Sequence, residues 1–85
     1  MVGEEKTRLT VSIYGKNYTI VGDESSEYIR TLAGYVEEKM HRIAQGNARL
    51  DTGRLAILSA INIADDYFRL RQKVEELEKQ LEKDK

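Results

Sequence analysis

The side chains in this sequence most suggestive of acid–base catalysis are the histidine His41 and the adjacent carboxylates Asp65 and Asp66. His41 is the only histidine, and no nucleophilic partner for it is apparent, so we interpret it as a surface residue. Asp65 and Asp66 are neighbours on a predicted helix, where successive side chains point about 100° apart and cannot act as an acid–base pair. We therefore expect a protein that is not an enzyme, with no metal and no cofactor.

Two further features have the chemistry to bind phosphates or nucleobases. Gly15 stands in a predicted turn, and without a Walker sequence it does not indicate a phosphate-binding loop. The five tyrosines could stack on bases, but no basic groove accompanies them. The 14 basic and 15 acidic residues give a net charge of −1. Because nucleic-acid affinity depends on a surplus of cations, we expect no nucleic-acid partner.

The composition indicates one small, soluble domain. A chain of 85 residues buries only a modest core, and oligomerisation is a common further source of stability at this size. The absence of cysteine fits a reducing compartment. We find neither a signal peptide nor a long apolar run, so we expect a cytoplasmic protein without membrane insertion.

The stretch from Asp51 to Lys85 carries a seam of uncharged residues spaced alternately four and three positions apart. A spacing of about 3.5 residues is typical of a helix that packs a narrow stripe against another helix. The seam begins at Ala56, and the members expected to mediate oligomerisation are Ala60, Ile63, Tyr67, Leu70, Val74, Leu77 and Leu81.

Charges beside this seam favour a parallel neighbour, because Asp66 would face Arg71 of a partner helix and Lys73 would face Glu78. Each such pair contributes only a few tenths of a kcal/mol. The alternative is a single solvated helix, but that would leave Leu70 and the apolar residues after it in water.

The first half of the same helix has a second apolar stripe, formed by Ile57, Ile61, Ala64 and Phe68, with Leu55 and Leu58 beside it. A helix that is apolar around much of its circumference must be covered on two sides. We therefore expect the rest of the domain to cover this half. Asn62 is a polar residue within it and a candidate hydrogen-bond partner for a loop.

Residues 7–22 alternate between apolar and polar side chains, as in a β-hairpin with one buried face. Gly15-Lys16 between the two alternating runs predicts a type II′ turn. This turn sets Ile13 opposite Tyr18. The residues expected on the buried face are Leu9, Val11, Ile13, Tyr18 and Ile20.

A first helix is predicted to begin at a cap formed by Ser25 or Ser26 and to end near Gln45, before Gly46-Asn47. Asp51-Thr52 then caps the long helix. Since the loop between the helices has only about five residues, we expect them to pack roughly antiparallel.

These elements predict an α+β fold with a small ββαα head, whose second helix extends as a coiled-coil stalk. We expect a flexible tail over residues 1–6, the head over 7–68 and the stalk over 69–85. We call residues 7–68 the head and residues 69–85 the stalk.

Three segments together resemble the ZapA family of bacterial cell-division proteins. They are LTVSIYGKNYTIVGDES near the start, EYIRTLAGYVEEKM in the first helix, and LDTGRLAILSAINIADDYFRLRQKVEELE. The resemblance implies a cytoplasmic protein at the mid-cell division site. Such a protein binds the tubulin-like FtsZ, promotes bundling of its filaments and has no catalytic residues or cofactor. It also implies homodimers that pair into homotetramers through antiparallel helices, so parallel and antiparallel pairs both remain open.

In this family FtsZ is met mainly by charged positions of the head. Carried onto this sequence, the resemblance implies Lys16, after the hairpin glycine, and Arg49 and Arg54, around the start of the long helix. Gly53 stands in a loop where other members vary. The alternative for each of the three cations is an ordinary solvated charge, and the alternative function is a coiled-coil adaptor or scaffold for another cytoplasmic partner.

Overall fold

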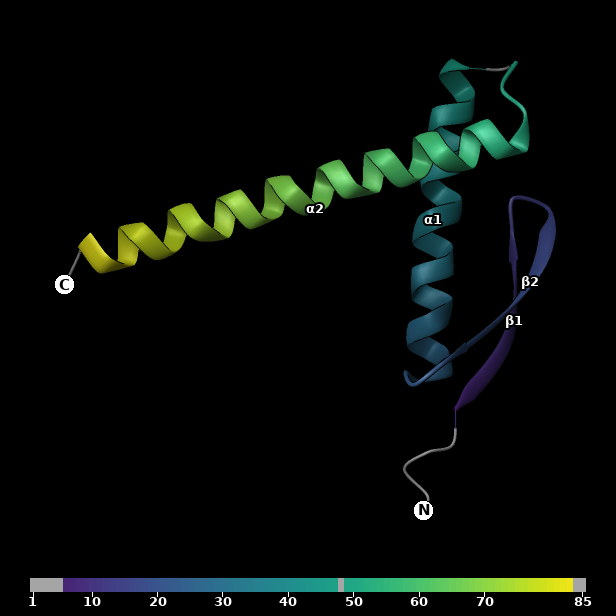
Figure 1. Cartoon of the computed structure of the whole chain (residues 1–85), viewed down its shortest axis with the longest axis horizontal. Coiled ribbons are helices and arrows are strands. Elements are labelled where there is room, and N and C mark those ends of the chain that lie inside the picture. The colour runs from purple at the N-terminus through teal and green to yellow at the C-terminus, as the bar shows by residue number, and fades with distance from the viewer. Residues whose placement is uncertain (1–5, 48, 84–85) are drawn as a thin grey trace.

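The structure is a computed structural model that describes residues 6–47 and 49–83. Its elements are, in order, β1 (Thr7–Ile13), β2 (Lys16–Gly22), α1 (Ser26–Gly46) and α2 (Thr52–Lys83). The predicted hairpin, followed by two helices of which the second is long, is confirmed (Figure 1). Most of the expected N-terminal tail, residues 1–5, lies outside the described residues. Lys6 forms an ion pair with Asp23 at 3.0 Å.

The hairpin turn lies one residue earlier than predicted. Ile13 pairs with Lys16, so the turn residues are Tyr14 and Gly15, with φ of 50° and 83°. Two positive φ angles are the pattern of a type I′ turn, and the predicted type II′ turn at Gly15-Lys16 is wrong. Positive φ is uncommon for a tyrosine. Here the Tyr14 ring lies 5.0 Å from the ring of His41 on α1, a tertiary contact that favours this turn.

The pairing of the strands shifts with the turn, by two residues. Val11 faces Tyr18 and Leu9 faces Ile20, so the predicted pairing of Ile13 with Tyr18 is wrong. A shift of two residues leaves every side chain on its original face, because strand side chains alternate with a period of two. The predicted faces therefore survive although the partners change.

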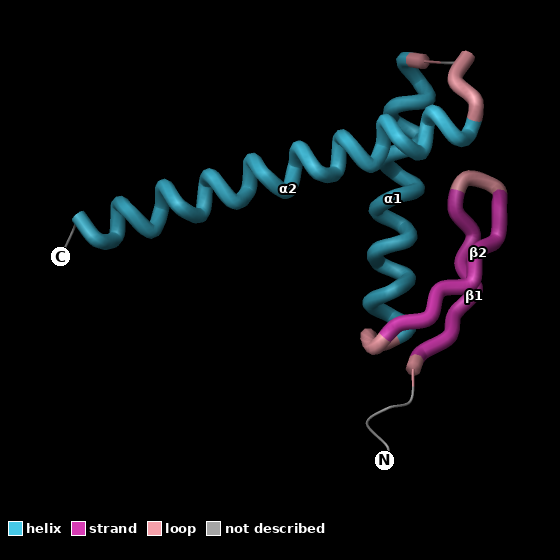
Figure 2. The backbone as a smooth tube through the Cα atoms, in the orientation of Figure 1, coloured by secondary structure: helices cyan, strands magenta, loops and turns pink. Residues whose placement is uncertain are grey.

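The core lies between the inner face of the hairpin and α1, which run side by side in Figure 2. Val11, Ile29 and Ala33 form its centre, and Leu9, Ile13 and Ile20 pack against them. Tyr18 belongs to the same face of the sheet but stays exposed. On the outer face, the hydroxyl groups of Thr10 and Thr19 meet at 3.1 Å across the two strands.

The N-terminal cap of α1 is one of the two predicted, whereas the helix runs one residue past the predicted end, includes Gly46 and is capped by Asn47. The Ser25 hydroxyl oxygen accepts a hydrogen bond from the Tyr28 N–H at 3.1 Å, and Glu27 lies in the first turn, where a negative charge is favoured. At the other end, the Asn47 N–H donates to the Ala44 carbonyl at 3.1 Å. The helix is therefore closed at both ends by residues in its own flanks.

The second helix begins where predicted, since the Asp51 carboxylate accepts a hydrogen bond from the Arg54 N–H at 2.7 Å. At about 1.5 Å per residue, the 32 residues of α2 span about 48 Å. In Figure 1, α2 crosses α1 steeply near its start and then runs away from the head. The expected antiparallel packing of the two helices is wrong.

The crossing follows from which face of α2 the rest of the chain covers. Within α2, the buried and half-buried residues form a single stripe: Thr52, Leu55, Ser59, Ile63 and Asp66. Leu55 and Ser59 are each only 1% exposed, and the Ser59 hydroxyl donates to the Leu55 carbonyl at 2.8 Å. A serine satisfied by its own helix leaves little bulk on this face, which lets another helix approach closely.

The second apolar stripe of α2 is not covered by the rest of the chain. Ile57 is 63% exposed, and Ile61 and Phe68 are exposed as well. The expectation that the head covers this half of the helix on two sides is therefore wrong for a single chain.

Candidate interaction surfaces

The three head cations implied by the resemblance lie at one end of the molecule. Lys16 is the exposed first residue of β2, directly after the turn. In Figure 1 this turn points toward the end of the head that carries the α1–α2 loop. The Tyr14–His41 contact holds the turn against the second half of α1.

Arg49 and Arg54 are brought together by the α1–α2 loop. Both line one shallow pocket with Asn47 and Leu50, and both are exposed. The Arg54 guanidinium lies 3.9 Å from the Asp51 carboxylate, at the outer limit of an ion pair. Such a contact is weak at an exposed site, so the guanidinium remains available to a partner.

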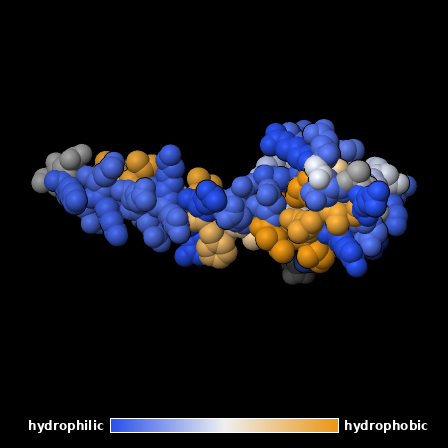
Figure 3. Space-filling model, turned by 90° about the horizontal axis from the view of Figure 1, so that it is seen from above, coloured by the Kyte–Doolittle hydropathy of each residue, from blue (hydrophilic) through white to orange (hydrophobic). Residues whose placement is uncertain are grey.

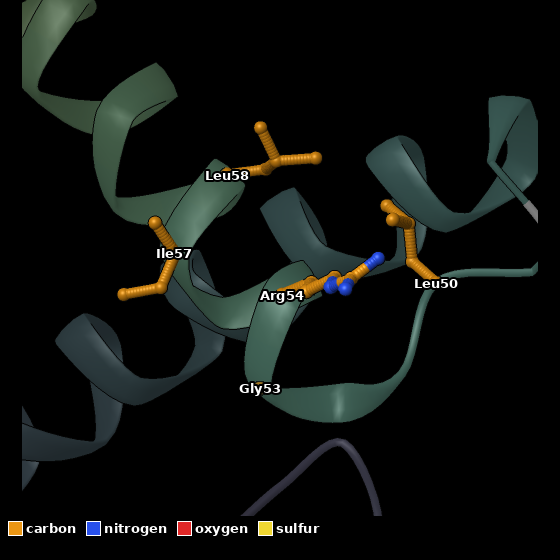
Figure 4. A pocket seen from close by; sticks show the side chains of 5 residues that line it. All are labelled: Leu50, Gly53, Arg54, Ile57 and Leu58. Atoms are coloured by element: carbon orange, nitrogen blue, oxygen red, sulfur yellow. The ribbon is translucent and has the colours of Figure 1, made fainter.

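An apolar pocket adjoins these arginines at the start of α2. Its lining comes from Leu50, Gly53, Arg54, Ile57 and Leu58. Figure 4 shows the Arg54 side chain extending toward Leu50, with Leu58 on the neighbouring side of the helix. Exposed cations beside apolar side chains are suited to contact with an acidic protein surface.

The seam of the stalk lies open along α2. Leu70, Val74, Leu77 and Leu81 are between 46% and 66% exposed. Ala60 and Tyr67 are exposed too, whereas Ile63 is half-buried on the head-facing stripe. In Figure 3 a large apolar surface covers the head end of α2, and separate apolar patches continue along the hydrophilic stalk.

An aromatic cluster stands where head and stalk meet. The rings of Tyr67 and Phe68 lie 5.2 Å apart, edge to face. The Arg71 guanidinium is 5.7 Å from the Tyr67 ring and 5.5 Å from the Phe68 ring, within the range of cation–π attraction. Arg71 thus lies over its own helix in the single chain.

Asp66 has a different partner from the predicted one. Its carboxylate accepts a hydrogen bond from the Tyr35 hydroxyl at 3.0 Å and pairs with the Lys39 ammonium group, both on α1. The hydrogen bond from Lys39, followed by that from Tyr35, holds the pKa of Asp66 below its ordinary value. The hydrogen bond to Asp66 raises the pKa of Lys39. Within the single chain Asp66 is thus held by α1, and its predicted pairing with Arg71 of a partner helix stays a prediction.

Tyr35 and Lys39 are the residues that sequence reasoning missed. Their spacing of four positions puts them on one side of α1, which is a signal visible in the sequence. Nothing in the sequence indicates that their common partner is Asp66, 31 positions after Tyr35.

The residues considered for acid–base catalysis each pair with a different neighbour. The His41 ring nitrogen lies 3.3 Å from the Glu37 carboxylate on the same helix, and Asp65 pairs with Arg69 at 2.9 Å. Asn62 is exposed and lines a shallow pocket between the two helices with Ile43 and Asn47.

Residues 6–47 and 49–83, the part of the chain that the structure describes, show neither a metal site nor a membrane span. This part of the chain contains no cluster of His, Asp or Glu that could hold a metal ion. Its helices also lack the length and apolarity needed to cross a membrane.

The sequence is similar throughout its length to one family of known proteins. The family model described as "Cell division protein ZapA" matches residues 9–85. A protein of that name from Geobacillus kaustophilus is 47% identical over 85 residues, which is all of this chain and 93% of the relative. Another from Bacillus subtilis strain 168 is 49% identical over 81 residues, covering 94% of this chain and 95% of the relative.

A solved structure also resembles this one. It is described as a ZapA mutant dimer from Geobacillus stearothermophilus, and it superposes with a TM-score of 0.73 at 43% sequence identity. The match covers 96% of this chain and 95% of the other.

Proposed function

Because the chain belongs to the ZapA family of cell division proteins, we propose that it binds filaments of the tubulin-like protein FtsZ and joins them into bundles. In this role it acts without catalysis, in the cytoplasm at the mid-cell division site, and promotes the assembly and stability of the division ring.

One observation carries the proposal: the exposed apolar seam of a long helix that leaves the head. The rest of the described chain covers none of the apolar side chains of this seam, and all four stay exposed: Leu70, Val74, Leu77 and Leu81. A second copy of the same helix supplies the apolar surface that such a seam needs. The similar structure from Geobacillus stearothermophilus is a dimer, which supports a homodimer here.

Bundling depends on the number of heads in one particle. A particle with a single head can decorate a filament, but joining two filaments requires two heads that engage at the same time. Dimers that pair through antiparallel stalks would place heads at opposite ends of a tetramer. With an α2 of about 48 Å, such heads stand far enough apart to reach separate filaments.

We assign the contact with FtsZ to the end of the head that carries Lys16, Arg49 and Arg54. All three are exposed, and the two arginines flank the same pocket. Oligomerisation is assigned to the other candidate set, from Ala60 to Leu81.

The test is co-sedimentation with polymerising FtsZ, measured beside right-angle light scattering at physiological salt. The protein should pellet with the filaments and should raise the scattering above that of filaments alone. Unchanged pelleting and unchanged scattering would contradict the proposal. Pelleting without a rise in scattering would leave an adaptor that binds filaments but does not join them.

A further inference from the structure

The contacts at the start of α2 are not sufficient to fix the direction in which this helix runs. Leu55 and Ser59, the two buried residues of this helix, are one turn apart, or about 6 Å along the axis. Ile63, one turn further along, is half-buried on the same face. A long helix held only by this short contact could pivot about it. The loop from Asn47 to Asp51 links the helices but does not constrain the far end of the rod.

Asp66 supplies a second attachment point. It lies seven residues beyond Ser59, about 10 Å further along the helix. Its carboxylate accepts a hydrogen bond from the Tyr35 hydroxyl and forms an ion pair with the Lys39 ammonium group, both on α1. Because this contact lies well beyond Leu55 and Ser59 along the axis, it can fix the direction of the helix after Asp66.

The three side chains form one connected cluster. Tyr35 and Lys39 are one turn apart on α1, and the Lys39 ammonium group lies 5.5 Å from the centre of the Tyr35 ring. The side chains of Lys39 and Asp66 are 15% and 42% exposed, whereas those of Lys6 and Asp23 in the other lysine pair are 56% and 79% exposed. Water and salt therefore screen the Lys39–Asp66 pair less than the other lysine pair.

We propose that Tyr35 and Lys39 are positioning residues which, by holding Asp66, fix the direction of α2, and of the stalk that continues it, relative to α1 and the hairpin. In an assembly of several chains this direction sets how the heads are oriented relative to one another. The consequence for function rests on the proposed crosslinking of filaments. The distance between filaments in a bundle is regular only if the angle between α1 and α2 is fixed.

The direct test measures a distance between head and stalk by electron paramagnetic resonance. The chain has no cysteine, so Asn17→Cys on β2 and Lys79→Cys on the stalk introduce the two labelling sites, both exposed. Labelled chains are mixed with a large excess of unlabelled chains, so that only distances within one chain are recorded.

The variant pair Tyr35→Phe/Lys39→Met removes the hydroxyl and the ammonium group but keeps the ring and the aliphatic stem. We expect the distance distribution to broaden or shift by several ångströms, with an unchanged helical circular dichroism spectrum. Arg69→Met is the matched control, because its pair with Asp65 lies within α2 and cannot orient the helix. Its distribution should equal that of the parent.

A double variant with the same distribution as the parent would overturn the inference, and so would an equal broadening in Arg69→Met. If the double variant fails to fold, the single change Tyr35→Phe decides in the same way. Electron micrographs of bundled FtsZ provide the functional readout, with irregular filament spacing expected for the variant. If the parent forms no bundles, the proposed function fails, but the distance measurement still decides this inference.

Discussion

Up to Asp66, one face of α2 lies against the rest of the chain, whereas from Leu70 onward the apolar residues of the same helix face solvent. Leu70 follows Asp66 by one turn, so the covered stripe and the exposed seam adjoin on the helix surface. The first part is shaped by contacts within the chain. The second part has an exposed apolar stripe, which we propose is covered by a second copy of the chain.

The largest effect should come from a charge placed in the exposed seam. Leu70→Glu would put an unpaired carboxylate between paired stalks, at a cost on the order of 3–5 kcal/mol. The helices should separate instead, and the protein should shift to smaller species in sedimentation velocity.

Gln72→Glu is the matched control, because it adds the same charge on the opposite side of the stalk and should keep the oligomeric mass of the parent. If Leu70→Glu also keeps that mass, the seam is not the interface, and the contrast between the two parts of α2 loses its meaning.

The next effect concerns the covered part. Leu55→Ala removes the most buried leucine side chain of the head and should lower the free energy of unfolding by about 2–5 kcal/mol. Leu32→Ala makes the same change on α1 where the side chain is 47% exposed, and should cost about 1 kcal/mol. Urea unfolding followed by circular dichroism measures both, and equal midpoints would mean that Leu55 does not anchor α2.

The turn offers a smaller perturbation, confined to the head. Gly15→Val forces a β-branched residue to a φ of 83° and should cost about 1–3 kcal/mol. Asn17→Val introduces the same side chain in the extended strand β2 and should leave the melting temperature nearly unchanged. An unchanged melting temperature for Gly15→Val would show that the turn in solution differs from the one described.

The hairpin also illustrates what alternation can and cannot predict. The faces of residues 7–22 follow from the pattern of apolar side chains, but a two-residue shift in pairing leaves those faces unaltered. The turn at Tyr14-Gly15, and not at Gly15-Lys16, is accompanied by the contact of Tyr14 with His41. That contact joins residues far apart in sequence, and no local pattern indicates it.

The crossing of the helices was unpredictable for a related reason. Caps and ends of both helices follow from local residues such as Ser25 and Asp51. The face of α2 that meets the rest of the chain contains a serine and an aspartate beside Leu55. Apolar periodicity therefore pointed to the neighbouring faces, which are the exposed ones. The cations assigned to FtsZ binding are untested by the fold and remain predictions.

The smallest effect on stability should come from the surface of the head. Lys16→Glu should change the free energy of unfolding by less than about 0.5 kcal/mol, because the side chain is exposed. The same change should weaken co-pelleting with FtsZ at unaltered oligomeric mass. Lys79→Glu reverses a charge on the stalk and should pellet like the parent; identical pelleting of both variants would remove Lys16 from the proposed contact.

The central claim is that filaments are joined because one particle carries several heads, and it is tested most directly by measuring binding and bundling in the same sample. Leu70→Glu is added to polymerising FtsZ, with co-pelleting and right-angle light scattering recorded together. The single-headed variant should still pellet with the filaments, more weakly than the parent since avidity is lost, and should not raise the scattering. A variant that is monomeric by sedimentation velocity and yet raises the scattering as the parent does would contradict the crosslinking mechanism.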